Sequence, residues 1–115
     1  MALTAEPGFQ VIAEAANGEE ALRQILSLLP DVAILDIDMP GLDGFAVVRE
    51  LNRMSSKAGI VILTLHTGMD LFREALEIGI RGYVLKSSAV NGIAEGVRRV
   101  AAGDTYFSPE LHEML

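Results

Sequence analysis

Three residues whose side chains could handle a phosphoryl group stand at the ends of short apolar runs: Asp36, Thr64 and Lys86. An exposed aspartate can act as a nucleophile toward phosphorus. An ammonium and a hydroxyl can each hold a phosphoryl oxygen. Phosphoryl transfer asks a protein mainly for positioning and for charge neutralisation. The three residue types therefore predict a phosphoryl-accepting site, provided that the fold brings them together.

Each of these residues also has an ordinary structural interpretation. An aspartate after a strand commonly caps a turn or a helix. A threonine is a frequent β-branched strand residue, and a lysine is usually a solvated charge. Any one of them alone favours the structural interpretation. Their coincidence at three strand ends is what favours the chemical one.

The elements that must position these residues alternate along the chain. Four apolar runs are continuous, as expected for strands covered on both faces; they are Phe9–Ala13, Val32–Leu35, Ile60–Leu65 and Tyr83–Leu85. Segments with helical spacing lie between and after them, namely 21–29, 45–51, 71–79 and 90–101. This alternation predicts an α/β fold with a doubly wound parallel sheet. In such sheets, chemistry lies outside the carboxyl ends of the strands.

Composition limits the classes of function. The chain has 115 residues, enough for one domain, and 9 basic against 16 acidic residues give 9 − 16 = −7, which argues against a broad nucleic-acid surface. It has no cysteine, which excludes disulfides and thiolate chemistry. We find neither a signal peptide nor an apolar run that could span a membrane. We therefore expect a cytoplasmic domain without membrane contact.

The motifs around these residues resemble one family. The resemblance is carried, in order, by 17–21, 31–44, 60–64, 82–86 and 101–111, whose sequences read NGEEA, DVAILDIDMPGLDG, IVILT, GYVLK and AAGDTYFSPEL. Together they are similar to the receiver domain of response regulators of the NarL/FixJ (LuxR-type) two-component family. The resemblance implies a flavodoxin-like fold.

The resemblance also implies roles for the three residues. Asp36 would accept a phosphoryl group from a sensor histidine kinase and hold it as an aspartyl phosphate. Lys86 would pair with that group. Thr64 would bind it and swing inward, while Tyr83 would change between exposed and buried rotamers. The chain would thus be a phosphorylated switch in transcription control and not an enzyme.

Further positions acquire roles through the same resemblance. Asp36 and the backbone carbonyl of Asp38 would hold Mg²⁺, and the side chains of Asp38 and His66 would tune the rate of hydrolysis. From its residue type alone, His66 is a partly exposed loop histidine. Pro40, Gly41 and Gly44 suit a tight loop that lets backbone approach the site.

The sequence departs from the family pattern at its start. The first strand with its acidic pair, and the first helix, have no counterpart before Phe9, so we expect an incomplete Mg²⁺ site. A gap in the sheet predicts a rearranged or swapped homodimer. We expect a receiver domain over residues 1–103 and the start of a linker over 104–115. DNA would be contacted only through a separate helix-turn-helix domain.

Two alternatives remain open from the sequence. Without the acidic pair, the chain could be a receiver-like interaction module that is not phosphorylated. The spacing of Asp36 and Asp38 also resembles the opening motif of haloacid-dehalogenase-type phosphatases. Pro40 and the short chain argue against the phosphatase.

Overall fold

The computed structural model describes residues 9–10, 12–37, 43–65 and 68–112, apart from the side chains of residues 88–91. Its sheet consists of β1 (Val32–Asp36), β2 (Gly59–Thr64), β3 (Gly82–Leu85) and β4 (Tyr106–Phe107). All neighbouring strands are parallel, and the order is β1-β2-β3-β4. Because the strands are parallel, their carboxyl ends share one edge of the sheet, as predicted from the alternation of elements.

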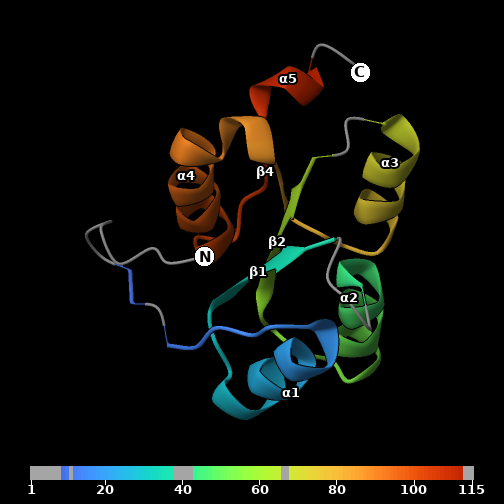
Figure 1. The fold of residues 1–115 in the computed structure, drawn as a ribbon, viewed down its shortest axis with the longest axis vertical. Helices are drawn as coiled ribbons and strands as arrows, with labels where there is room; N and C mark the ends of the chain where they lie inside the picture. Colours follow the sequence, from blue (N-terminus) through green and yellow to red (C-terminus); the bar gives the residue numbers. More distant parts are fainter. Residues whose placement is uncertain (1–8, 11, 38–42, 66–67, 113–115) are drawn as a thin grey trace.

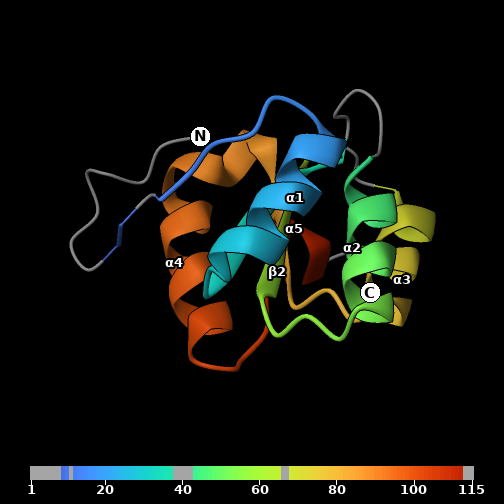
Figure 2. The same cartoon turned by 90° about the horizontal axis from the view of Figure 1, so that it is seen from below.

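Helices cover both faces of this sheet. They are α1 (Gly18–Leu28), α2 (Gly44–Arg53), α3 (Met69–Glu77), α4 (Ala89–Ala101) and the short α5 (Pro109–His112), and a 3₁₀ turn, η1, spans Lys86–Ser88. Figures 1 and 2 show α4 on one side of the sheet and α2 and α3 on the other. The fold is therefore the predicted doubly wound, flavodoxin-like arrangement.

Two hydrophobic cores follow from this layering, because alternate strand residues face opposite sides of the sheet. One core joins the sheet to α1, α2 and α3, with Ile62 and Tyr83 among its fully buried members. The other joins the sheet to α4, with Val61 and Val84 fully buried in it. The central strands β2 and β3 are buried on both faces, which explains their continuous apolar sequences.

Local signals set the helix ends. The side chain of Asn17 accepts a hydrogen bond from the Glu20 amide at 2.9 Å and so caps α1. Gly79 follows the C-cap of α3 with a φ of +84°, a conformation that glycine adopts without strain. The helical spacing over residues 71–79 predicted a helix there, and the structure ends α3 just before this glycine.

The strand predicted for Phe9–Ala13 is wrong in the part that the structure describes. Residues 9, 10, 12 and 13 have no strand conformation there, and Ile12 is half exposed. Phe9 packs instead against the core on the α4 side. Apolar sequence alone does not make a strand, because a strand also needs a neighbour for its backbone hydrogen bonds. On the described residues, β1 pairs with β2 only.

A strand that the sequence did not predict, β4, extends the sheet on the far side. It pairs with β3 through Gly82 and Tyr106 and through Tyr83 and Phe107. The ring of Tyr106 lies against α4. Two glycines of this helix, Gly92 and Gly96, leave room for the ring. Leu111 of α5 is fully buried in the core that joins the sheet to α1, α2 and α3. Described residues up to Leu111 therefore pack on the domain, and a linker beginning at residue 104 stays a prediction.

Candidate functional site

The carboxyl edge of the sheet brings the carboxylate of Asp36 and the ammonium of Lys86 into contact. Asp36 is the last residue of β1, and Lys86 directly follows β3. The Nζ of Lys86 lies 2.5 Å from the Oδ2 of Asp36. The side chain of Lys86 is 28% exposed and that of Asp36 is 36% exposed, so the pair is in contact with solvent. A reacting group could therefore reach it from outside.

Strand register explains why residues 50 positions apart meet. Asp36 lies opposite Leu63 of β2, and Thr64 lies opposite Leu85 of β3. Each strand thus delivers its last residue to the same edge, and the long side chain of Lys86 spans the intervening strand. Thr64 closes β2 between them and is fully buried.

The backbone at Asp36 is approached closely by the start of α2. A Cβ added to Gly44 would lie 3.2 Å from the carbonyl oxygen of Asp36 and 3.3 Å from the Cα of Ile37. These are tight contacts with backbone, which cannot yield as a flexible side chain can. Glycine at this position therefore lets the helix begin directly beside the acid, as the sequence suggested. Asp43 caps α2 by accepting a hydrogen bond from the Ala46 amide at 2.9 Å.

Tyr83, in the strand that precedes Lys86, is fully buried. Its ring packs edge-on against Phe72 of α3, with ring centroids 5.2 Å apart. Its hydroxyl has no partner in hydrogen-bond geometry among the described residues. Burial raises the pKa of this hydroxyl, and a smaller contribution from the nearby Thr64 hydroxyl opposes that shift. The resemblance to the family implied an exposed and a buried rotamer for Tyr83, and the structure shows the buried one.

The buried hydroxyl leads to a prediction for alkaline pH. Because the pKa of Tyr83 is raised in the folded state, the unfolded state loses its proton first as the pH rises. The free energy of unfolding should therefore fall above about pH 10, the ordinary tyrosine pKa. Tyr83→Phe should remove this part of the loss. Urea unfolding of both proteins at about pH 8 and about pH 11 measures the difference.

A loss of unfolding free energy at alkaline pH that is equal in the wild type and in Tyr83→Phe would contradict this prediction. At about pH 8 the variant should be at least as stable as the wild type, because it removes a buried hydroxyl that has no partner in hydrogen-bond geometry among the described residues.

Several residues of the predicted site lie outside the described residues: Asp38, His66, Pro40 and Gly41. Their roles stay predictions. Among the described residues, no group of three His, Cys, Asp or Glu could hold a metal ion. The Oδ2 of Asp36 is engaged by Lys86, and the Asp43 side chain caps α2. The described side chains alone therefore do not supply the ligands for the expected Mg²⁺.

One residue at this edge was not singled out from the sequence. Ser108 is fully buried, and its Oγ accepts a hydrogen bond from the Leu85 amide at 2.9 Å. The signal that could have found it is the pair Ser108–Pro109, since serine followed by proline commonly begins a helix.

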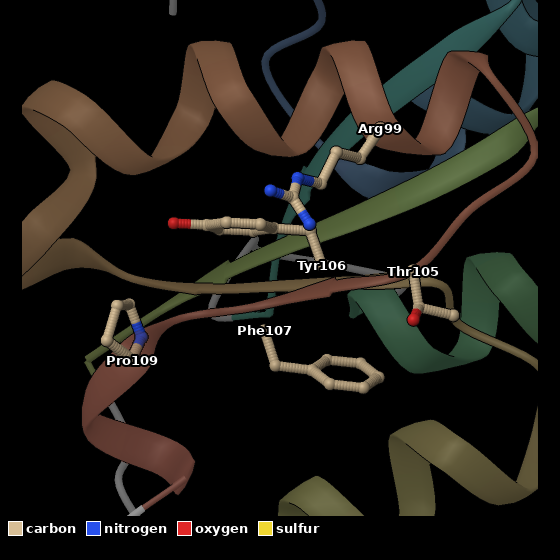
Figure 3. Close-up of a pocket in the computed structure, with 5 residues that line it drawn as sticks. All are labelled: Arg99, Thr105, Tyr106, Phe107 and Pro109. Atoms are coloured by element: carbon tan, nitrogen blue, oxygen red, sulfur yellow. The ribbon is translucent and has the colours of Figure 1, made fainter.

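A shallow pocket lies at the outer edge of β4, near the C-terminal end of the described chain. Figure 3 shows its lining, which comprises Arg99, Thr105, Tyr106, Phe107 and Pro109. The guanidinium of Arg99 lies over the Tyr106 ring, 5.8 Å from its centroid. Neither Asp36 nor Lys86 lines the pocket, so the pocket is separate from the site that these two residues form.

Comparison with known proteins identifies the family. The sequence pattern of the response regulator receiver domain matches residues 1–98, and the chain belongs to this family. It is 40% identical over 109 residues to the transcriptional regulatory protein YvfU of Bacillus subtilis (strain 168), covering 95% of this chain and 54% of that protein. The chain spans about half the length of the curated relatives it matches.

Solved structures agree with this assignment. A LuxR-family two-component response regulator from Aurantimonas sp. SI85-9A1 superposes with a TM-score of 0.87 at 34% identity, covering 93% of this chain and 76% of that one. The signal receiver domain of NarL from Mycobacterium tuberculosis gives a TM-score of 0.84 at 33% identity, covering 88% and 82%. Nothing in these comparisons supports the phosphatase alternative. In the part of the chain that the structure describes, no helix is long and apolar enough to cross a membrane.

Proposed function

We propose that this chain is a phosphorylation switch that accepts a phosphoryl group on Asp36 from a sensor histidine kinase. The observation that carries the proposal is the contact of 2.5 Å between Asp36 and Lys86 at the carboxyl edge of a receiver-family sheet. An accessible carboxylate beside a fixed positive charge is the arrangement that phosphoryl transfer to a side chain requires.

The proposed reaction balances as a simple displacement. A carboxylate oxygen of Asp36 attacks the phosphorus of a phosphohistidine, a P–O bond forms and the P–N bond breaks. The departing imidazole takes the bond's electron pair and is protonated. Water later cleaves the acyl phosphate, which returns Asp36 to the carboxylate and releases inorganic phosphate.

Lys86 supplies charge neutralisation in this proposal. The ammonium that pairs with Asp36 in the resting site would pair with a phosphoryl oxygen as negative charge is transferred. Lys86→Met should therefore slow phosphoryl incorporation by about tenfold or more, since a unit charge pair at this range contributes about 1–4 kcal/mol. Time courses of incorporation from acetyl phosphate measure the rate. The control is Lys57→Met, which removes an exposed lysine elsewhere; equal rates in the two variants would contradict the role of Lys86.

Thr64 and Tyr83 are proposed to transmit the change. Thr64 ends the strand next to Asp36, and Tyr83 lies on the adjacent strand. A new phosphoryl oxygen would draw the Thr64 hydroxyl toward it. That movement would change the surroundings of the Tyr83 ring and so alter the surface near β4.

Receiver domains bind Mg²⁺ as a family. In this chain we propose that Asp36 and the backbone of Asp38 contribute to such a site, and that Asp38 and His66 tune hydrolysis. The described residues do not by themselves form the site. The reaction above is therefore derived from Asp36 and Lys86 without a step through the metal.

The output is proposed from the relatives. Those matched over most of this chain are transcriptional regulatory proteins and response regulators about twice its length. We propose that the chain controls transcription through a separate DNA-binding domain. The expected division into a receiver over residues 1–103 and a linker from residue 104 belongs to this proposal.

We also propose that the chain forms a homodimer. On the described residues, β1 pairs on one side only, and two of its apolar residues, Val32 and Ile34, are half-buried. Such an edge can pair with another chain. Light scattering at micromolar concentration should give the mass of a dimer. A monomer mass together with a cooperative thermal transition would count against it.

The direct test of the proposed function is intact mass spectrometry after incubation with acetyl phosphate and Mg²⁺. One phosphoryl group should be added to the wild-type chain. No addition from acetyl phosphate or from a phosphorylated histidine kinase would favour the alternative, an interaction module that is not phosphorylated.

A further inference from the structure

A buried serine in the C-terminal segment, residues 106–112, contacts β3 beyond the end of the β3–β4 ladder, next to Lys86. Ser108 follows β4 directly and has no exposed surface. Its backbone amide donates a hydrogen bond to the Tyr83 carbonyl at 3.0 Å. Its Oγ accepts one from the Leu85 amide at 2.9 Å. Ser108 thus holds two points of β3 at once.

The second of these hydrogen bonds replaces strand pairing. The ladder between β3 and β4 pairs Gly82 with Tyr106 and Tyr83 with Phe107, and it ends there. Beyond that point the Leu85 amide donates to the side chain of Ser108. Leu85 is buried, so an amide deprived of this partner could not simply turn to water.

The position of this contact relates it to the site. Leu85 is the last residue of β3, and the next residue is Lys86, at the start of η1. The peptide that Ser108 holds therefore sets the direction in which the lysine side chain leaves the sheet. We propose that Ser108 is a positioning residue, which holds the end of β3 so that the Nζ of Lys86 reaches Asp36.

The same contact works in both directions. A change in how Lys86 is held at Asp36 would reach Ser108 through Leu85, and so the segment over residues 106–112. This deepens the proposed function and rests on it where phosphorylation is concerned. The positioning of Lys86 itself can be measured without any phosphoryl group.

The sequence offers an internal reference for that measurement, because the chain contains only two lysines, Lys57 and Lys86. Lys57 is exposed, whereas Lys86 is paired with Asp36. Trace acylation with acetic anhydride followed by peptide mass spectrometry gives the ratio of the two reactivities. Ser108→Ala should raise the ratio of Lys86 to Lys57 by about two- to tenfold, the range that corresponds to the loss of one hydrogen bond.

Two control variants separate positioning from general loosening of the fold. Asn17→Ala removes another side-chain acceptor of a backbone amide, at the cap of α1. Ile25→Ala weakens the packing of α1 in the core that joins the sheet to α1, α2 and α3. Neither residue belongs to β3, β4 or η1, so neither variant should change the ratio in the folded protein. Ser108→Cys, which keeps a weaker acceptor, should give a smaller rise than Ser108→Ala and serves if the alanine variant does not fold.

An unchanged ratio in the folded Ser108 variants would overturn the proposal, as would an equal rise in Ile25→Ala. A second readout is the initial rate of phosphoryl incorporation from acetyl phosphate, which should fall in Ser108→Ala and not in Asn17→Ala; an equal rate in wild type and Ser108→Ala would also overturn it. If the wild type takes up no phosphoryl group, the proposed function fails, and the lysine ratio alone decides the role of Ser108.

Discussion

Asp36→Asn should abolish phosphoryl incorporation, leaving a protein of unchanged mass after incubation with acetyl phosphate. The amide is nearly the same size as the carboxylate but is not a nucleophile toward phosphorus. The substitution also removes the negative partner of Lys86, which lies 2.5 Å away. Intact mass spectrometry of wild type and variant, incubated in parallel, measures the effect. We expect one added phosphoryl group in the wild type and none in the variant.

The matched control for this prediction is Asp31→Asn. Asp31 precedes the same strand at its opposite end and is exposed. The variant has the same change of charge, and it should incorporate one phosphoryl group as the wild type does. Incorporation by Asp36→Asn at the wild-type level would show that another residue is the acceptor and would remove the basis of the proposed function.

Phe72→Ala should cause the largest loss of stability among the single variants considered. Phe72 is 1% exposed, and its ring meets those of Tyr83 and Phe107 edge-on, each with a centroid distance of 5.2 Å. Removing a buried phenyl ring costs about 3–5 kcal/mol. Small domains have a total free energy of unfolding of about 5–15 kcal/mol. We therefore expect a large shift of the urea midpoint, or a protein that is partly unfolded without denaturant.

Leu76→Ala, on the same helix, is the control for Phe72→Ala. Leu76 is 44% exposed, so the substitution creates little cavity and should change the free energy of unfolding much less. Equal losses in the two variants would contradict the central place of Phe72 in the core. Because Phe72 joins β3 to β4 through its two ring contacts, its loss should also loosen the C-terminal segment.

Much of the fold could be predicted because local and tertiary signals agree in the centre of the sheet. The continuous apolar sequences of β2 and β3 arise because both faces are covered by helices. The start of α1 at residues 17–21 and the end of α3 near Gly79 agree with the sequence for the same reason, since each depends on a few neighbouring residues. Agreement of this kind is what makes a segment predictable from its own sequence.

The edges of the sheet could not be predicted in the same way. Residues 9–13 have the composition of a strand, but a strand exists only if another strand supplies its hydrogen bonds. The two residues of β4 are too few to produce a periodic pattern. The closeness of Asp36 and Lys86 follows from parallel register. The contact of Ser108 with Leu85, by contrast, joins residues 23 positions apart, which local patterns do not relate.

The two glycines beneath the Tyr106 ring bear on how the protein folds. Gly92 and Gly96 lie in the middle of α4, where each glycine disfavours helix by about 1 kcal/mol relative to alanine. Such a helix is poorly formed by itself and gains its order from the sheet against which it docks. Formation of α4 should therefore be a late event in folding, coupled to the arrival of β4 at the sheet. A chain that has been synthesised only as far as residue 105 would lack the Tyr106 ring, against which the middle of α4 packs.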